Sequence, residues 1–249
     1  TLTISTLSFG QSSDLYISMF GEGSSNNKFI EIYNGTNAEI DLTGYSISTC
    51  SNGCDIEGEF DYPDNVVFEA GTIIAAGDVY VIAHGSADPL IDADQTFAYL
   101  SNGDDFMALT LAGATANSFT IVDALGDMST VDGTGWDIAG VSNATVNHTL
   151  TRKPTICDPN SVPLGSFGTN AEDSEWIVGE SNSGWSDLQT HTGCVSGPVL
   201  SITSPSNNQV LESGTISVTL SVSVDNFAVD NTPANGGTGD GHIHWTLDG

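Results

Sequence analysis

The chain has 249 residues, with 32 Asp and Glu against three Lys and Arg, so its formal net charge is −29. Hydrophobic residues make up 39 % of the chain, enough for a folded core, so disorder along the whole length is not expected. Nucleic acids and anionic membrane surfaces are bound by clustered cations, which three basic residues do not supply, so we expect neither partner. No apolar run approaches the roughly 18 residues of a membrane-spanning helix, and no membrane insertion is expected.

Short alternating runs of hydrophobic residues recur along the first part of the chain, separated by Gly, Asn, Asp and Ser. A period of two predicts β-strands, and the helices that connect parallel strands are missing. Turn signals such as Asn34-Gly35 stand between the runs. This spacing is typical of an antiparallel β-sandwich. The predicted strands are Leu15–Phe20, Phe29–Tyr33, Tyr45–Thr49, Val79–Ala83, Phe106–Leu111, Phe119–Leu125 and Thr149–Lys153.

A domain boundary is predicted at Gly197-Pro198. Beyond it, the runs Leu200–Thr203, Ile216–Val224 and Ile243–Leu247 have the pattern of further strands. About 50 residues are few for an independent sandwich. We therefore expect a first domain over residues 1–196 and an incomplete C-terminal β-sandwich module over residues 197–249.

The four cysteines, at positions 50, 54, 157 and 194, allow three pairings. We favour Cys50–Cys54, which closes a short turn, and Cys157–Cys194, which closes a longer loop; on the chain-entropy model they stabilise by about 2 and about 4 kcal/mol. The rival interpretation is a zinc site built from all four thiolates, although such sites usually contain two CxxC pairs. Disulfides, an acidic surface and scarce Lys point to a location outside the cytoplasm. A start at Thr1 is expected of a processed secreted protein or of a fragment.

Short motifs follow one another in a fixed order from Asp14 to Cys194. They occupy residues 23–36 (GSSNNKFIEIYNGT), 40–45 (IDLTGY), 75–82 (AAGDVYVI), 102–105 (NGDD), 122–127 (VDALGD), 147–153 (NHTLTRK) and 175–177 (EWI). The ordered series resembles bacterial lamin tail domains. The resemblance implies an immunoglobulin-like β-sandwich that serves as an accessory module of secreted or surface proteins, including extracellular nucleases and phosphatases.

The resemblance implies fold and context rather than chemistry, because the family has no agreed catalytic constellation. The chain also departs from the family at residues 18–21 (SMFG), where bacterial relatives usually read Ser-Glu-Tyr-Val or similar. This departure removes a carboxylate beside the loop at residues 23–27 and weakens any site carried over to that place.

No catalytic residues are predicted from the motifs. A hydrolytic carboxylate pair needs a set distance and separated pKa values, and an acidic solvated surface is the ordinary origin of many carboxylates. The signatures GxSxG and HExxH, the P-loop and the dinucleotide fingerprint are all missing. Arg152 and Lys153, adjacent in a carboxylate-rich chain, are expected to pair with acidic neighbours, with contact to an anion or a partner as the alternative.

Metal binding is the more plausible chemistry. Ca²⁺ prefers carboxylate and carbonyl oxygens, which Gly-rich turns offer at several places, although none has the EF-hand spacing. One of these places is the loop that contains Asp123, Asp127, Asp132 and Asp137. The other candidate oxygens belong to the pairs Asp92 and Asp94, and Asp104 and Asp105.

His242 and His244 offer a second kind of metal site. Residues i and i+2 of a strand face the same side, so both imidazoles would reach one Zn²⁺ or Cu²⁺, with Asp240 as the nearest third ligand. The alternative is a solvated or packed pair of histidines beside Trp245. His84, His148 and His191 are isolated in the sequence, and loop or packing roles are expected for them.

Exposed aromatic rings are candidates for stacking on glycans. Trp136, Trp176 and Trp185 are such candidates, with packing in the core or anchoring of loops as the commoner role of Trp. Glycosylation sequons begin at Asn34, Asn143 and Asn147, and in a bacterial chain we interpret them as coincidental.

The sequence therefore predicts a non-catalytic β-sandwich module of a secreted or surface-displayed bacterial protein. Its work would be adhesion, assembly or presentation through its loops, beside other domains of a larger protein. One alternative is an accessory domain of a secreted nuclease or phosphatase whose catalytic domain lies outside this chain. The other is a metal-dependent ligand-binding module that uses the C-terminal histidines.

Overall fold

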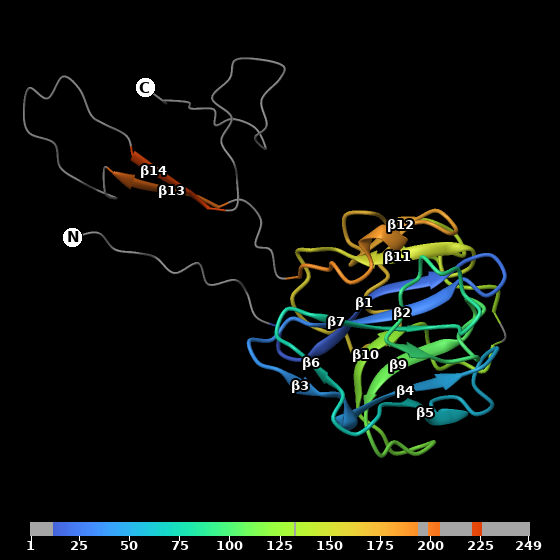
Figure 1. The fold of residues 1–249 in the computed structure, drawn as a ribbon. Helices are drawn as coiled ribbons and strands as arrows, with labels where there is room; N and C mark the ends of the chain where they lie inside the picture. Colours follow the sequence, from blue (N-terminus) through green and yellow to red (C-terminus); the bar gives the residue numbers. More distant parts are fainter. Residues whose placement is uncertain (1–11, 132, 194–198, 205–220, 226–249) are drawn as a thin grey trace, which may run out of the picture. The chain divides into compact units, whose positions relative to one another are not determined.

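The computed structural model describes residues 12–131, 133–193, 199–204 and 221–225, and their regular secondary structure is almost entirely β-strand (Figure 1). The chain divides into two compact units, residues 1–194 and residues 195–249. Among the described residues, no helix has both the length and the apolar composition needed to cross a membrane.

The first unit contains a six-stranded sheet in the order β12-β11-β1-β2-β7-β8. Neighbouring strands are antiparallel except for β7 and β8, which run parallel and so depart from the expected all-antiparallel pairing. The strands are β1 (Leu15–Glu22), β2 (Lys28–Asn34), β7 (Val79–Ala83), β8 (Gln95–Thr96), β11 (His148–Arg152) and β12 (Trp176–Gly179).

A four-stranded antiparallel sheet, in the order β10-β9-β4-β5, packs against the first sheet (Figure 1). A two-residue ladder and two short 3₁₀ turns complete the unit. The strands are β4 (Tyr45–Cys50), β5 (Tyr62–Val67), β9 (Phe106–Leu111) and β10 (Ile121–Leu125), with β3 (Ile40–Asp41) and β6 (Ile73–Ile74) as the ladder and the turns at Leu42–Gly44 and Trp185–Asp187.

The main hydrophobic core lies between the two sheets. Alternate residues of β2, Ile30 and Ile32, enter it from the six-stranded sheet, and Ile47 and Leu109 enter it from β4 and β9. Because strand side chains alternate in direction, these positions form one continuous apolar layer. The immunoglobulin-like β-sandwich expected from the sequence is confirmed.

The outer face of each sheet is also covered, by loops. On the six-stranded sheet, Phe29 and Val81 pack with Leu188, and on the four-stranded sheet, Phe106 packs with Phe60. Residues between two apolar layers are buried whichever way they point. This explains why β1 and β2 are buried at every position instead of alternating between buried and exposed.

All seven strands predicted for the first unit are present, with ends that differ by a few residues, whereas β3, β5, β6, β8 and β12 were not predicted. β5 shows why: it contains Pro63, and Asp64 has a positive φ of 49°. Pro is tolerated only where a ladder bond is not needed, as on this edge of the sheet. The residues of β5 have a low intrinsic preference for a strand, and its pairing with β4 holds them in one.

The second unit contains an antiparallel pair, β13 (Val199–Ser204) and β14 (Ser221–Asp225). The strand predicted at Leu200–Thr203 is confirmed. Residues 221–224 of the predicted strand Ile216–Val224 lie in β14, and its earlier part lies outside the described residues, as does the predicted strand Ile243–Leu247.

Candidate binding site

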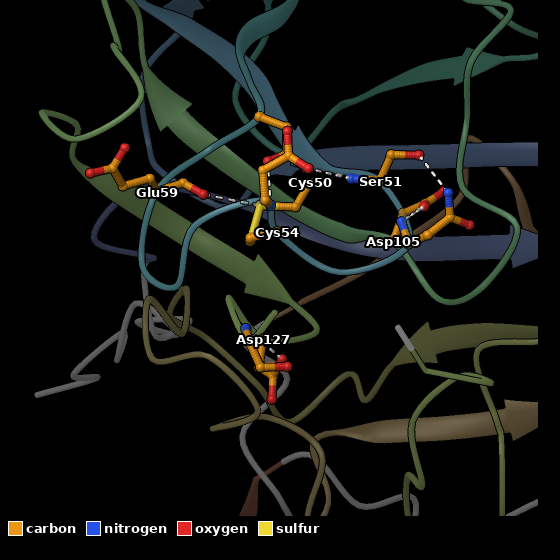
Figure 2. Close-up of a disulfide and its surroundings, with 10 residues drawn as sticks. Cys50, Ser51, Cys54, Glu59, Asp105 and Asp127 are labelled. Atoms are coloured by element: carbon orange, nitrogen blue, oxygen red, sulfur yellow. Dashed lines mark hydrogen bonds between the residues drawn. A yellow bond between two sulfur atoms is a disulfide. The ribbon is translucent and has the colours of Figure 1, made fainter. Parts of the chain in front are cut away.

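A disulfide between Cys50 and Cys54 closes the turn that follows β4 (Figure 2). The two sulfur atoms are 2.05 Å apart, and both residues are buried against Phe60 and Phe106. Asn52, inside the turn, has a positive φ of 56°, a conformation that Asn tolerates better than most residues. The predicted pairing of Cys50 with Cys54 is confirmed, and these two thiols are not zinc ligands.

Cys157 is half-buried and forms no disulfide with another described cysteine. Its predicted partner, Cys194, lies outside the described residues. Their pairing stays a prediction.

A pocket of about 380 Å³ lies beside the disulfide, over one end of β4, β5 and β9. Thr49 of β4 is the register partner of both Tyr62 of β5 and Met107 of β9, so three lining residues form one row across the sheet. Met107 belongs to the sandwich core. The inner end of the pocket is therefore rigid, because core side chains are close-packed. The lining consists of Thr49, Cys50, Ser51, Tyr62, Asn65, Tyr99, Ser101, Asp105 and Met107.

Two tyrosines in this lining are exposed: Tyr99 has 82 % of its surface accessible and Tyr62 has 52 %. The same lining contains small uncharged polar side chains and one carboxylate, that of Asp105. Asn65 donates a hydrogen bond to the Thr49 hydroxyl at 2.8 Å. The pocket thus combines aromatic faces with an amide and hydroxyl groups.

Asp105 supplies the carboxylate of this pocket, and backbone amides hold it in place. Its Oδ1 accepts a hydrogen bond from the Asn52 amide at 2.8 Å, and its Oδ2 accepts one from the Asn102 amide at 3.1 Å. These bonds connect the disulfide turn to the loop that carries Tyr99. Figure 2 shows Asp105 and Ser51 close together beside the disulfide.

A second pocket, of about 260 Å³, shares Ser51, Tyr99 and Asp105 with the first. We call the two together the tyrosine groove. The remaining lining of the second pocket is mostly polar and consists of Ser25, Asn26, Lys28, His84, Ala98, Leu100 and Asn102.

Lys28 is the cation that lines the groove, and its charge is compensated within the fold. Its Nζ lies 3.4 Å from a Glu22 carboxylate oxygen and donates hydrogen bonds to the Ser101 carbonyl at 3.1 Å and to Asn102 Oδ1 at 2.5 Å. Glu22 and Lys28 are direct partners across β1 and β2. Lys28 therefore anchors the loop that carries Tyr99, instead of offering a free positive charge.

Arg152 is fully buried, together with the carboxylate of Asp123. Its guanidinium lies 2.6 Å from Asp123 and 2.9 Å from Glu175, with the Trp176 ring 4.4 Å and the Tyr16 ring 5.7 Å away. We call these five residues the Arg152 cluster. The expectation that Arg152 pairs with acidic neighbours is confirmed. Lys153 instead donates hydrogen bonds to the carbonyls of Ala171 and Ser174.

Asp123, predicted as a Ca²⁺ ligand, is fully buried in this cluster. Besides Arg152, its carboxylate accepts hydrogen bonds from the backbone amides of Ile17 and Asn160. Burial raises the pKa of Asp123, and Arg152 and the two amides oppose that rise. The structure therefore gives Asp123 the role of a counter-ion.

The other predicted metal ligands are not gathered into a site by the residues described. Asp127 accepts a hydrogen bond from the Ser129 amide, and no group of three or more potential metal-ligating side chains occurs in the described ranges. Asp132, Asp240, His242 and His244 lie outside those ranges, so their metal sites stay predictions.

The tryptophans and Asn34, which the sequence offered as candidates for contact with glycans, have structural roles. Trp176, predicted as a possible glycan-stacking residue, is only 1 % exposed, so that role is wrong and the alternative of core packing is confirmed. Trp136 and Trp185 are half-buried and pack against hydrophobic clusters. Asn34 is fully buried, and its amide donates hydrogen bonds to two backbone carbonyls, so its sequon is inaccessible.

The tyrosine groove was missed because its signal is spread over five segments that are distant in sequence. Neither Tyr62 nor Tyr99 lies in a motif, and Pro63 masked the strand that carries Tyr62. The sequence did carry a signal in a family motif, because residues 102–105 (NGDD) include Asp105 of the groove.

A family model described as the Lamin Tail Domain matches residues 10–129. This region is a lamin tail domain. The match ends before β11 and β12, which the structure adds to the same six-stranded sheet as β1. The sandwich of this lamin tail unit therefore continues past the matched residues, over the longer range that the sequence motifs indicated. No curated protein and no solved structure matches the chain.

Proposed function

We propose that the chain is a non-catalytic, extracellular or cell-surface module that serves adhesion, assembly or presentation within a larger secreted protein. The observation that carries this proposal is the lamin tail domain itself, an immunoglobulin-like sandwich, with a recess formed by loops and strand ends. Such surfaces are where β-sandwich modules commonly bind partners.

The two cations that form ion pairs in the described residues are engaged in the fold. Asp123 and Glu175 neutralise Arg152, and Glu22 neutralises Lys28. A general acid or base must instead be free to exchange a proton with a substrate. These pairs support a structural role for the buried charges.

The Cys50–Cys54 disulfide supports an oxidising location, because cytosolic reductants keep most thiols reduced. The net charge of −29 agrees with a surface in contact with a cation-containing exterior. A bound Ca²⁺ remains part of the proposal, as does the site at Asp240, His242 and His244. Melting the protein with and without EDTA tests both, and an unchanged melting temperature would count against them.

The proposal is tested by locating the full-length protein in the cells that produce it. An epitope tag placed after Leu90, an exposed loop residue, would be detected on intact cells or in the medium. Alkylation before lysis would leave Cys50 and Cys54 unlabelled, because both are oxidised. A tag protected from external protease, together with two labelled thiols, would contradict the proposal.

A further inference from the structure

We propose that the tyrosine groove binds a neutral saccharide, an inference that rests on the proposed adhesion function and names its ligand class. The groove contains the two exposed tyrosines, and its two pockets measure about 380 and about 260 Å³. Together these volumes match a binding site for a few sugar rings rather than for a large folded partner.

The tyrosines supply the apolar half of the interaction. One face of a pyranose ring is a row of C–H groups, and this face packs on an aromatic ring with little loss of hydration. Tyr99 has 82 % of its surface exposed and Tyr62 has 52 %, although both line a recess. Amphipathic rings left open in this way are typical of binding surfaces. A sugar would bury them without disturbing the core.

The polar half of the interaction comes from uncharged groups. Ser51 and Asn65 line the first pocket, and Ser25, Asn26 and Asn102 line the second. Hydroxyl and amide groups both donate and accept hydrogen bonds, as sugar hydroxyls do. A run of such groups beside exposed rings therefore complements a polyhydroxylated ligand.

Electrostatics exclude an anionic ligand from the groove. Lys28 is neutralised by Glu22, Asp105 adds a negative charge, and the whole chain carries −29. Phosphorylated, sulfated and uronic saccharides would be repelled. A cationic peptide is the rival occupant, but it would meet Asp105 as the one carboxylate of the described lining, with both oxygens already holding backbone amides.

The groove is held in shape from two sides before any ligand arrives. The Cys50–Cys54 disulfide closes the turn on one side, and Lys28 anchors the Tyr99 loop through the Ser101 carbonyl on the other. Pre-organisation of this kind increases affinity because fewer side chains and loops are ordered on binding.

The experiment applies the full 249-residue chain to immobilised neutral oligosaccharides, namely glucans, mannans, galactans, xylans and chitooligosaccharides. Sulfated glycans and Lys-rich peptides are included as charged comparisons. The strongest neutral ligand is then titrated by calorimetry against the wild type and three variants. We expect Tyr99→Ala to weaken binding tenfold or more, since truncation of an aromatic anchor removes a dominant contact.

The two other variants separate ring stacking from general surface effects. Tyr99→Phe retains the ring and should keep most of the affinity. Leu90→Ala, at a residue that is 72 % exposed and lines neither pocket, should keep all of it. Because the ligand is uncharged, the affinity should not change with salt concentration.

Two outcomes would overturn the inference. The first is a folded protein, judged by near-ultraviolet circular dichroism, that binds none of the neutral saccharides. The second is salt-sensitive binding of the Lys-rich peptides that Tyr99→Ala abolishes, which would assign the groove to a cationic segment. Neither outcome bears on the cellular location of the protein, so the proposed function would still be judged by the tagging experiment.

Discussion

The Arg152 cluster and the tyrosine groove both combine aromatic rings with polar side chains, and both lie in the lamin tail unit. In the cluster, Trp176 and Tyr16 cover a guanidinium that two carboxylates neutralise, and of the five residues only Glu175 is partly exposed. In the groove, Tyr62 and Tyr99 are open to solvent beside mostly uncharged polar groups. Rings that complete a buried network stabilise the fold, whereas rings that are left open are available to a ligand.

The largest expected effect comes from breaking the cluster. Arg152→Met leaves Asp123 buried without its counter-ion, so the free energy of unfolding should fall by about 3–5 kcal/mol. Urea titration measures this loss. The double variant Arg152→Met with Asp123→Asn should recover part of the loss, because it removes both buried charges and keeps an oxygen that can accept from the Ile17 or the Asn160 amide. Equal stability of the single and double variants would show that the ion pair does not dominate this region.

His191 makes the same region sensitive to acid. It stacks edge-on with Tyr33 and is hydrogen-bonded to the Tyr16 hydroxyl, and burial, with Arg152 nearby, lowers the pKa of His191 to about 4. The unfolded chain binds this proton near pH 6.5. The contribution of neutral His191 to the free energy of unfolding is therefore fully present above pH 6.5 and is lost as the pH falls towards 4. It amounts to at most about 3 kcal/mol.

Urea titrations between pH 4 and pH 7 test this, with His191→Phe as the comparison. The variant keeps an aromatic ring but has no titrating group, so its stability should depend less steeply on pH. If the wild type and His191→Phe have identical pH profiles, then His191 is protonated in the fold without cost.

The groove is tested by removing its disulfide. The double variant Cys50→Ser with Cys54→Ser should lose about 2 kcal/mol of stability, because the closed loop is short. It should also bind saccharide more weakly than the wild type, since the turn that carries Ser51 would no longer be held. Cys157→Ser is the matched control and should retain the saccharide affinity. Unchanged affinity in the double variant would show that the turn is held by its hydrogen bonds instead.

The smallest expected effect is that of salt on the whole unit. At a net charge of −29, screening should raise the stability by about 1 kcal/mol or less between low and moderate salt. Thermal unfolding in increasing NaCl measures this. A flat response would mean that the carboxylates are too dispersed to repel one another.

Much of the sandwich was predictable because its central strands carry their own signal. Phe29–Tyr33 and Phe106–Leu111 are short hydrophobic runs that lie between turn residues, so local pattern and tertiary position agree. The strand β12 is short and lies at the edge of its sheet, so its sequence carries little strand signal. Its formation depends on pairing with β11.

The site was less predictable, for a related reason. Cys50 and Cys54 are close in sequence, so their disulfide could be inferred directly. By contrast, Asp123 looked like a loop carboxylate available to a metal. Asp123 instead forms an ion pair with Arg152, which is 29 positions away in the sequence.

The sequence by itself determined the fold class, the family, the short disulfide and the lack of basic residues for binding a polyanion. These follow from composition and from patterns that act over a few residues. Only the tertiary structure decided which aromatic rings are exposed and which carboxylates form ion pairs. Exposure and ion pairing depend on which strands and loops the sandwich brings together, and for Tyr62, Tyr99 and Arg152 those neighbours are far away in the chain.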